Sequence, residues 1–245
     1  MKIMSFNVRI NVEVDKMNSW EYRKDEVAKF INKEHPDIIG LQEPNLEMLD
    51  YLMDKLTRYR MVGLPRSNNG EFTPILYDTL KLTLVFTETF WLSDSPNKES
   101  RFETSFYIRI ATYGLFKTNE DKFISVVNTH LDYQSEEIQC MQMKVILDYL
   151  KQKTIYPQVI MGDFNAIPSA SIHQLLHENE FKSIYLGEQL LCNTFHGFTG
   201  ITKGEPIDYI YVSKHLKSIH SKILDQKNTE NYLSDHFPVT VEITI

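Results

Sequence analysis

The chain is predicted to be built from apolar strands that end in polar or charged side chains. The clearest case is the apolar run at residues 157–161, which is followed by Gly162-Asp163-Phe164-Asn165. Short apolar runs of this kind are typical of buried strands. Side chains two apart on a strand share a face, so we expect Asp163 and Asn165 to point the same way and Phe164 to face a core. Alone, the motif is equally consistent with a turn, because Asp and Asn often follow strands.

The predicted elements alternate between strands and helices. Apolar and alternating patterns indicate strands at residues 2–8, 37–43, 59–64, 72–77, 80–91, 106–117, 123–130, 158–163, 207–213, 217–224 and 237–244. Helical spacing indicates helices from residue 18 or 19 to 35, and at 46–56, 135–153 and 169–178. The middle of the chain is strand-rich and antiparallel in character, whereas its flanks alternate. This order favours an α/β (α+β) fold of two packed mixed β-sheets with helices outside.

The composition limits the class of protein. The 245 residues contain no internal repeat, low-complexity tract or Gly-, Pro- and Ser-rich linker, so we expect a single domain over residues 1–245. The formal net charge of −7 argues against a protein that coats nucleic acid non-specifically. A local basic groove remains compatible with that charge.

Nothing in the sequence indicates a membrane or secreted protein. No apolar run reaches the ~18 residues of a membrane-spanning helix, and residues 1–7 lack the features of a secretory signal. Cys140 and Cys192 allow one disulfide at most, and two reduced thiols are the simpler interpretation. We therefore expect a cytoplasmic protein, and no obligate protein partner is indicated.

Polar groups at the other predicted strand ends extend the pattern. They are Asn7, Glu43, His130, Asp208, Asp235 and His236. In layered α/β proteins, strand ends and the loops beyond them are where sites are built. Each residue alone has an ordinary explanation as a turn residue, a helix cap, a solvated acid or a core histidine. Their joint occurrence favours a site.

Carboxylates that cluster at one site would need something to relieve the repulsion between their charges. Two carboxylates ~4 Å apart repel by about 4 kcal/mol at an effective dielectric near 20. Protonation, separation or a cation relieves that repulsion. The available ligands are hard oxygens, without a cysteine cluster or paired histidines at zinc spacing, and this favours Mg²⁺ or Mn²⁺. One or two of the acids would suffice as direct ligands.

Six segments together resemble the endonuclease/exonuclease/phosphatase superfamily, whose fold is that of deoxyribonuclease I. They are Ser5-Phe6-Asn7, Leu41-Gln42-Glu43, Asn128-Thr129-His130-Leu131, Gly162-Asp163-Phe164-Asn165, Ile207-Asp208-Tyr209-Ile210 and Ser234-Asp235-His236. They occur in the family's order from one end of the chain to the other. The resemblance implies a four-layer sandwich, a divalent metal and hydrolysis of a phosphoester by in-line attack of water.

The resemblance also implies which residues hold the metal. Glu43 would be the main ligand, with Asn7 beside it. Asp235 would be a second metal contact or a support for the site.

The remaining motif residues would carry the chemistry. Asp163 would orient and deprotonate the water, and Asn165 would hold the water or donate to the phosphoryl oxygens. His236, oriented by Asp208, would contact the scissile phosphate. His130 would donate to the same phosphate. These roles agree with general acid–base and metal-assisted phosphoryl chemistry.

Two residues of this chain differ from the pattern of one branch of the family, which indicates a closer similarity to other branches. Apurinic/apyrimidinic endonucleases usually carry a tyrosine at the position of His130 and an acid at the position of Arg9. The Asn-Thr-His-Leu form is similar instead to nocturnin-type deadenylases, sphingomyelinases and a broad group of uncharacterised bacterial hydrolases. Segments 20–23, 89–93 and 194–198 most resemble that last group, for which membership leaves the substrate open. Within the first segment, we expect Trp20 to pack and Arg23 to be a surface charge.

Five further residues are candidates for substrate binding. Arg109, on a strand of the middle sheet, is a candidate for binding phosphate, although the sequence favours a surface ion pair for it. The others, which would line a substrate cleft, are Tyr77, Trp91, His196 and Phe198. Core packing is an equal alternative for Tyr77 and Trp91.

Three functions are consistent with these features. The first is a Mg²⁺- or Mn²⁺-dependent phosphoesterase that acts on a small or medium phosphorylated molecule. The second is a nuclease for DNA or RNA, which would need a basic, aromatic-lined groove. The third is a non-catalytic binding module, which would be expected to have lost one of the acids or the last histidine.

Overall fold

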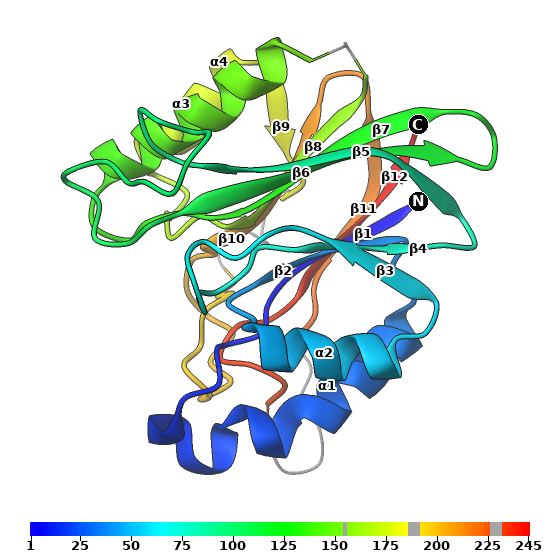
Figure 1. Ribbon diagram of the computed structural model, residues 1–245, viewed down its shortest axis with the longest axis vertical. Helices are drawn as coiled ribbons and strands as arrows, with labels where there is room; N and C mark the ends of the chain where they lie inside the picture. Colours follow the sequence, from blue (N-terminus) through cyan, green and yellow to red (C-terminus); the bar gives the residue numbers. More distant parts are fainter. Residues whose placement is uncertain (154–155, 186–191, 226–231) are drawn as a thin grey trace.

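Two six-stranded sheets lie face to face in the computed structural model, which describes residues 1–153, 156–185, 192–225 and 232–245 (Figure 1). The first sheet has the order β11 (Lys217–Ile223), β12 (Val239–Thr244), β1 (Lys2–Asn7), β2 (Ile38–Gln42), β4 (Ile75–Asp78) and β3 (Tyr59–Val62). The second has the order β5 (Leu82–Trp91), β6 (Ile110–Thr118), β7 (Phe123–His130), β8 (Gln158–Asp163), β10 (Asp208–Ser213) and β9 (Phe181–Ser183). Both sheets mix parallel and antiparallel pairs.

Helices cover the outer face of each sheet, which completes four layers (Figure 1). The first sheet carries α1 (Trp20–Glu34) and α2 (Leu46–Lys55), and a short 3-10 helix, η1 (Glu13–Asn18), precedes α1. The second sheet carries α3 (Glu136–Lys151) and α4 (Ser171–Glu178). The predicted four-layer sandwich is therefore confirmed. None of the helices in the described ranges is long and apolar enough to cross a membrane.

Side-chain capping starts two of the helices. The carboxamide of Asn45 accepts a hydrogen bond from the Met48 backbone N–H at 3.0 Å at the start of α2. The Ser135 hydroxyl accepts one from Ile138 at 3.3 Å at the start of α3. These oxygens satisfy backbone donors that have no partner inside the helix.

Alternation along β1 explains why a polar group reaches the space between the sheets. Met4 and Phe6 pack with residues of α1 and α2. Ile3 points the other way, into the core that both sheets share. Asn7 has the same parity as Ile3, and it therefore faces the second sheet at the end of the strand.

A buried amide network joins the two sheets below that strand end. Nε2 of Gln42 donates to Oδ1 of Asn128 at 2.7 Å and to Oγ of Ser5 at 3.2 Å. Nδ2 of Asn128, on the second sheet, donates to the Leu41 carbonyl of the first at 2.7 Å. A Cβ on Gly40 would lie 2.6 Å from Oδ1 of Asn128, so glycine makes room for the network. Because unpaired buried amides are costly, the network favours one alignment of the sheets.

The boundaries of several elements differ from prediction. The strand expected at 106–117 begins at Ile110, and the strand expected at 72–77 begins at Ile75. Asp132 explains the first difference, because its Oδ2 accepts hydrogen bonds from Ser105 Oγ at 2.7 Å and from the Tyr107 backbone at 2.9 Å. These bonds fix residues before Ile110 as a loop. Neither η1 nor β9 was predicted.

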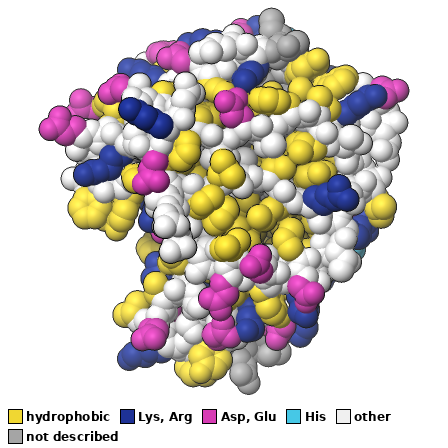
Figure 2. All heavy atoms as spheres, in the orientation of Figure 1, with side chains coloured by type: hydrophobic (Ala, Val, Ile, Leu, Met, Phe, Trp, Pro, Cys, Tyr) yellow, Lys and Arg dark blue, Asp and Glu magenta, His cyan; other side chains and the backbone are white. Residues whose placement is uncertain are grey.

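Charged side chains are dispersed over the face of the molecule seen in Figure 1. On this face Lys and Arg lie singly among acidic side chains, and apolar side chains gather near the centre (Figure 2). This agrees with the excess of acids in the composition.

Candidate active site

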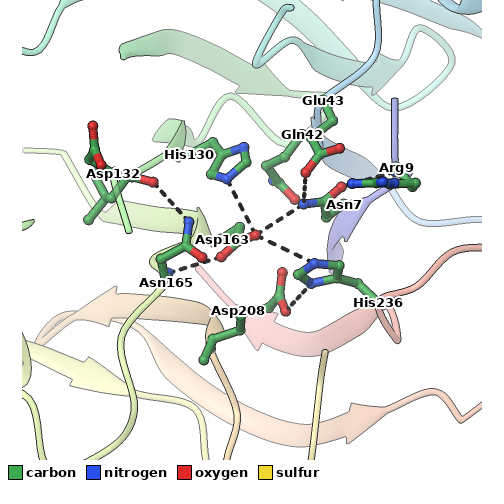
Figure 3. Close-up of polar contacts among 12 residues, drawn as sticks. Asn7, Arg9, Gln42, Glu43, His130, Asp132, Asp163, Asn165, Asp208 and His236 are labelled. Carbon is green, nitrogen blue, oxygen red and sulfur yellow. Dashed lines mark hydrogen bonds and ion pairs between the residues drawn. The ribbon is translucent and has the colours of Figure 1, made fainter. Parts of the chain in front are cut away.

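Three side chains of the second sheet form a row at one end of the sandwich. Asp163, the last residue of β8, pairs with His130 at the end of β7 and with Asp208 at the start of β10. Paired residues on neighbouring strands share a face, so all three side chains point toward the first sheet. Nε2 of His130 lies 3.5 Å from Oδ2 of Asp163 (Figure 3). All three residues are buried.

The first sheet meets this row through Asn7 and Glu43. Nδ2 of Asn7 donates to Oδ2 of Asp163 and to Oε1 of Glu43, both at 3.0 Å (Figure 3). Oε2 of Glu43 accepts a hydrogen bond from the Ile10 backbone at 2.9 Å. Since β1 and β2 are parallel, their ends lie at the same edge. One carboxamide therefore links acids from the two sheets.

His236 closes the group from the segment before β12. Its Nδ1 lies 2.8 Å from Oδ2 of Asp208, and its Nε2 lies 3.7 Å from Oδ2 of Asp163 (Figure 3). Burial alone would lower the pKa of His236, but the negative charges of Asp208 and Asp163 outweigh it and raise the pKa to about 10. This imidazole is therefore protonated at neutral pH.

The two acids and the other imidazole titrate differently. Burial, reinforced by the charge of Asp208, raises the pKa of Asp163 to about 7. Burial, together with the charges of Arg109, His236 and Arg66, holds the pKa of His130 well below its usual range. A neutral and a protonated imidazole therefore face the same carboxylate.

Asn165 lies at the site, but not because it alternates with Asp163 along a strand, as one of the two predictions for this motif had it. β8 ends at Asp163, and Asn165 has a left-handed backbone with φ of 52°. Its backbone N–H donates to Oδ1 of Asp163 at 2.9 Å, and its Nδ2 donates to the Leu131 carbonyl at 2.9 Å. Strand alternation therefore does not relate the two side chains, because a turn follows the strand. Both nevertheless line the same cavity.

Gly162 allows β8 to lie close to β7. Its φ is +147°, and a Cβ at this position would lie 1.9 Å from the Thr129 carbonyl oxygen. Glycine therefore fits a strand position directly before Asp163 that other residues would strain.

The cavity at this site has a volume of about 350 Å³. We use the name strand-end rim for Asn7, Glu43, His130, Asp163, Asp208 and His236, which lie on or directly beside the strand ends. We use the name arginine wall for the cavity-lining residues Arg66, Glu71, Tyr107, Arg109 and Tyr133. Four rim residues line the cavity, namely Glu43, His130, Asp163 and His236, and its lining is completed by Arg9, Ile10, Asn165, Phe195, Ile207 and Asp235.

Asp235 lies beside the rim and faces a basic neighbour. Its Oδ2 is 3.7 Å from Nε of Arg9, and Arg9 also pairs with Asp15 at 2.9 Å. Burial raises the pKa of Asp235, and His236 and Arg9 oppose that shift. Arg9 therefore offsets part of the negative charge on this side of the cavity.

The substrate-binding candidates are dispersed. Arg109 lines the cavity and is buried, so the alternative of a surface ion pair is wrong. Tyr77 packs in the core, 5.1 Å from the ring of Phe116. Trp91 donates through Nε1 to the Arg66 carbonyl at 2.8 Å, and it thereby helps to fix the backbone of one arginine-wall residue.

His196 and Phe198 lie on the segment next to the rim. The ring of His196 stacks on Phe237 with centroids 4.0 Å apart, and burial lowers its pKa to about 4. The guanidinium of Arg23 lies 5.6 Å from the centre of the Phe198 ring. Both candidates therefore pack against neighbours that adjoin the site.

Arg23 has a structural role that the sequence did not reveal. It was expected on the surface, but it is fully buried. Its guanidinium donates to the backbone carbonyls of Val8 at 2.9 Å and Arg9 at 3.1 Å, and also to that of Leu233. It thereby joins the end of β1 to the segment that carries His236. Its helical spacing from Trp20 gave no sign of this contact.

Most of the arginine wall was also missed. Four of its members were not candidates: Arg66, Glu71, Tyr107 and Tyr133. They lie in loops, where no periodicity distinguishes a buried side chain from an exposed one. The aromatic pair at 106–107 in a predicted strand was the available signal, and it was interpreted as part of a sheet.

The rim has the donor chemistry of a hard divalent cation. Asp163, Asp208 and His236 each offer one ligand atom, and these atoms lie within 4.8 Å of one another. Oδ1 of Asp208 is buried without a hydrogen-bond partner among the described residues. Glu43 and Asp235 add carboxylates to the same cavity. Because His236 already contacts Asp208 and is protonated, the carboxylates are the better donors, and the set fits a hard divalent cation.

Solved structures with the same fold include two bacterial proteins. A conserved protein of unknown function from Enterococcus faecalis has a TM-score of 0.92 and 32% sequence identity, covering 100% of this chain and 99% of the other. A mannosyl-6-phosphatase from Bacteroides thetaiotaomicron has a TM-score of 0.92 and 25% identity, covering 100% of both chains.

Sequence comparison agrees with the fold. The chain is 22% identical over 303 residues to the 3'-5'-exoribonuclease subunit Ccr4 of the CCR4-Not complex from Kluyveromyces lactis, a match that covers 93% of this chain and 38% of the relative. The chain thus spans well under half the length of that relative. The family model described as endonuclease/exonuclease/phosphatase matches residues 4–236. The resemblance inferred from the motifs is therefore confirmed, and the chain belongs to the endonuclease/exonuclease/phosphatase family.

Proposed function

We propose that the chain is a divalent-metal-dependent phosphoesterase that hydrolyses a small or medium phosphorylated molecule by in-line attack of water. The observation that carries this proposal is the strand-end rim. The imidazoles of His130 and His236 and the carboxylates of Asp163 and Glu43 line one cavity. Asp208 and Asn7 contact these residues from beside it. Members of the family are hydrolases of phosphoester bonds.

Asp163 is proposed to orient the attacking water and take its proton. Its Oδ1 accepts a hydrogen bond from Asn165 and its Oδ2 accepts one from Asn7, so the carboxylate is held at both oxygens. A base fixed in this way needs little reorganisation when it acts. The bond from the water oxygen to phosphorus forms as the bond to the leaving oxygen breaks, and the leaving oxygen takes up a proton.

The two histidines are proposed to stabilise the phosphoryl oxygens. The contact with Asp208 orients the His236 ring, so that its Nε2 is on the side of Asp163. His130 presents Nε2 from the other side of Asp163. Donors fixed around a centre where negative charge grows are among the strongest contributions to catalysis.

Glu43, Asn7 and Asp235 are proposed to hold Mg²⁺ or Mn²⁺, with Asp163 and Asp208 as the neighbouring acids. A bound divalent cation would polarise the phosphoryl group and lower the pKa of a bound water. Arg9, which contacts Asp235, limits the negative charge on this side of the cavity.

The size of the cavity supports a small or medium substrate. About 350 Å³ lies at the lower end of the roughly 300–1,000 Å³ that small-molecule sites occupy. The similarity to a mannosyl-6-phosphatase agrees with a substrate of this size.

A nuclease is the second candidate. The similarity to Ccr4 favours it, as does a group of exposed aromatic rings in which Phe106 and Tyr107 each lie 5.9 Å from Tyr133. Such rings stack on bases in single strands. The dispersed basic side chains of Figure 2 are less favourable to a long nucleic acid.

An activity screen with Mn²⁺ tests both candidates. The substrates are phosphosugars, nucleotides, phospholipid head groups and oligonucleotides, and the Asp163→Ala protein is the blank. We expect turnover of a small phosphoester by the wild type alone. Cleavage of oligonucleotides that falls steeply with salt would favour the nuclease instead. If neither class is turned over above the blank, the phosphoesterase proposal is wrong.

A further inference from the structure

Arg109, on the arginine wall, carries a charge without an ionic partner. The residue is 5% exposed and lines the cavity. Its Nε has no hydrogen-bond partner, and its guanidinium makes no hydrogen bond or ion pair with any residue in the described ranges. A buried unpaired cation is costly, so a partner from outside the chain would relieve it.

The neighbours of Arg109 are already engaged. Glu71, the nearest acid on the wall, pairs with Nη2 of Arg66 at 2.9 Å. The ring of Tyr107 lies 5.2 Å from the Arg66 guanidinium and 5.3 Å from that of Arg109. Burial lowers the pKa of Arg109, and Glu71 and Asp132 oppose that shift without contacting it directly. The wall thus holds Arg109 in place but leaves its donors free for a ligand.

The order of the strands places Arg109 next to the reacting groups. It directly precedes β6, and β6 lies beside β7, which ends in His130. The in-register row runs from His130 through Asp163 to Asp208, with His236 beside Asp208. Because β6 pairs Ala111 with Thr129, Arg109 lies at the β6 end of this row, one residue beyond the position opposite His130. Arg109 and His130 line the same cavity. A phosphoryl group above Asp163 has His236 on one side and Arg109 beyond His130 on the other.

We propose that Arg109 binds a terminal oxygen of the scissile phosphate and that the substrate is therefore a phosphomonoester. This inference rests on the proposed phosphoesterase function. A monoester carries a third unsubstituted oxygen and a second negative charge, whereas in a diester a second organic group occupies that position. The guanidinium fork pairs bidentately with phosphate oxygens and supplies the matching charge.

A matched pair of chromogenic substrates tests the inference. We would measure kcat/KM with Mn²⁺ for p-nitrophenyl phosphate and bis(p-nitrophenyl) phosphate, using the wild type, Arg109→Met and Arg109→Lys. We expect the wild type to prefer the monoester. Arg109→Met should lower kcat/KM for the monoester by about 10- to 100-fold and for the diester by less than about threefold. Arg109→Lys keeps the positive charge but lacks the bidentate guanidinium. Its kcat/KM for the monoester should therefore lie between the values of the wild type and Arg109→Met. Arg60→Met, on the exposed part of β3, is the control.

Several outcomes would overturn the inference. They are a wild type that prefers the diester, an equal loss on both esters in Arg109→Met, or no loss on either. Thermal unfolding shows whether Arg109→Met is folded. If it is not, Arg109→Lys is decisive through competitive inhibition by inorganic phosphate, which should weaken relative to the wild type, and unchanged inhibition would overturn the assignment. A wild type that turns over neither ester would instead reject the phosphoesterase function itself.

Discussion

The strand-end rim and the arginine wall adjoin the same cavity, but they are built differently. The rim consists of side chains fixed by strand register, and each is hydrogen-bonded or close to the next, as Asn7 is to Asp163. The wall consists of loop residues held from behind by Trp91 and Asp132. Most rim side chains contact one another, although Oδ1 of Asp208 and Nδ1 of His130 have no hydrogen-bond partner among the described residues, whereas the wall leaves Arg109 without an ionic partner.

The difference indicates that the rim and the wall have separate roles. The register of the paired strands fixes the positions of their side-chain atoms closely. This suits groups that must be placed accurately around a reacting phosphorus. Loops tolerate substitution without loss of the fold, which suits groups that select a substrate. Changes on the rim should therefore remove turnover, and changes on the wall should alter preference.

Loss of a rim histidine should give the largest effect. We expect His236→Ala to lower kcat by about 100- to 10,000-fold, because the group proposed to stabilise the phosphoryl oxygens is removed. Steady-state kinetics with Mn²⁺ measure this, with the exposed His220→Ala on β11 as the control. Activity within about twofold of the wild type would mean that the rim is not the reactive centre.

A change directly beside the rim, at Gly162, tests the spacing of β7 and β8. Gly162→Ala should lower the free energy of unfolding by about 2–4 kcal/mol, because its Cβ would overlap the Thr129 carbonyl and its φ suits glycine. Thermal unfolding should show a decrease in Tm, with activity reduced because Asp163 moves. Gly197→Ala, whose Cβ would meet its nearest neighbour at 3.8 Å, is the matched control for space. An unchanged Tm would contradict the proposed role of this glycine.

Much of the rim was predictable, because strand ends follow from hydrophobic pattern and the motifs occur in the family's order. Asn7, Asp163 and Asp208 converge for that reason. For Asn165 the sequence left two alternatives, a position on the same strand face as Asp163 or a turn, and it could not choose between them because it does not show where the strand ends. The burial of Arg23 and Arg109 depends on contacts between residues far apart in sequence, and the residue type favours the surface. The wall was missed because loops lack periodicity.

Removal of the proposed main ligand should affect the metal before the chemistry. We expect Glu43→Ala to raise the Mn²⁺ concentration for half-maximal activity by at least about tenfold. It should also reduce the rise in Tm that saturating metal gives the wild type, since a bound metal stabilises the folded state by mass action. Excess Mn²⁺ should restore part of the activity. If no concentration restores any of it, Glu43 is not a ligand.

A change on the wall should have the smallest effect. Tyr133 is 54% exposed, so Tyr133→Ala should leave Tm and kcat nearly unchanged. We expect the KM for a phosphorylated substrate that contains a ring to rise by about two- to tenfold, because the contact between that ring and the ring of Tyr133 is lost. A loss of kcat as large as that of His236→Ala would show that wall and rim cannot be separated.

The position of β12 also sets the moment at which the site can form during synthesis. β12 pairs with β1 inside the first sheet, and Ser234 Oγ donates to the Asn7 carbonyl at 2.7 Å. β1 thus remains unpaired on this side until β12, more than two hundred residues later in the chain, has been made. At about 5–20 residues per second this takes roughly ten seconds or more, while one edge of β1 stays open. In a nascent chain the rim therefore cannot form until β12 has left the ribosome, and until then that open edge is where a chaperone would be needed.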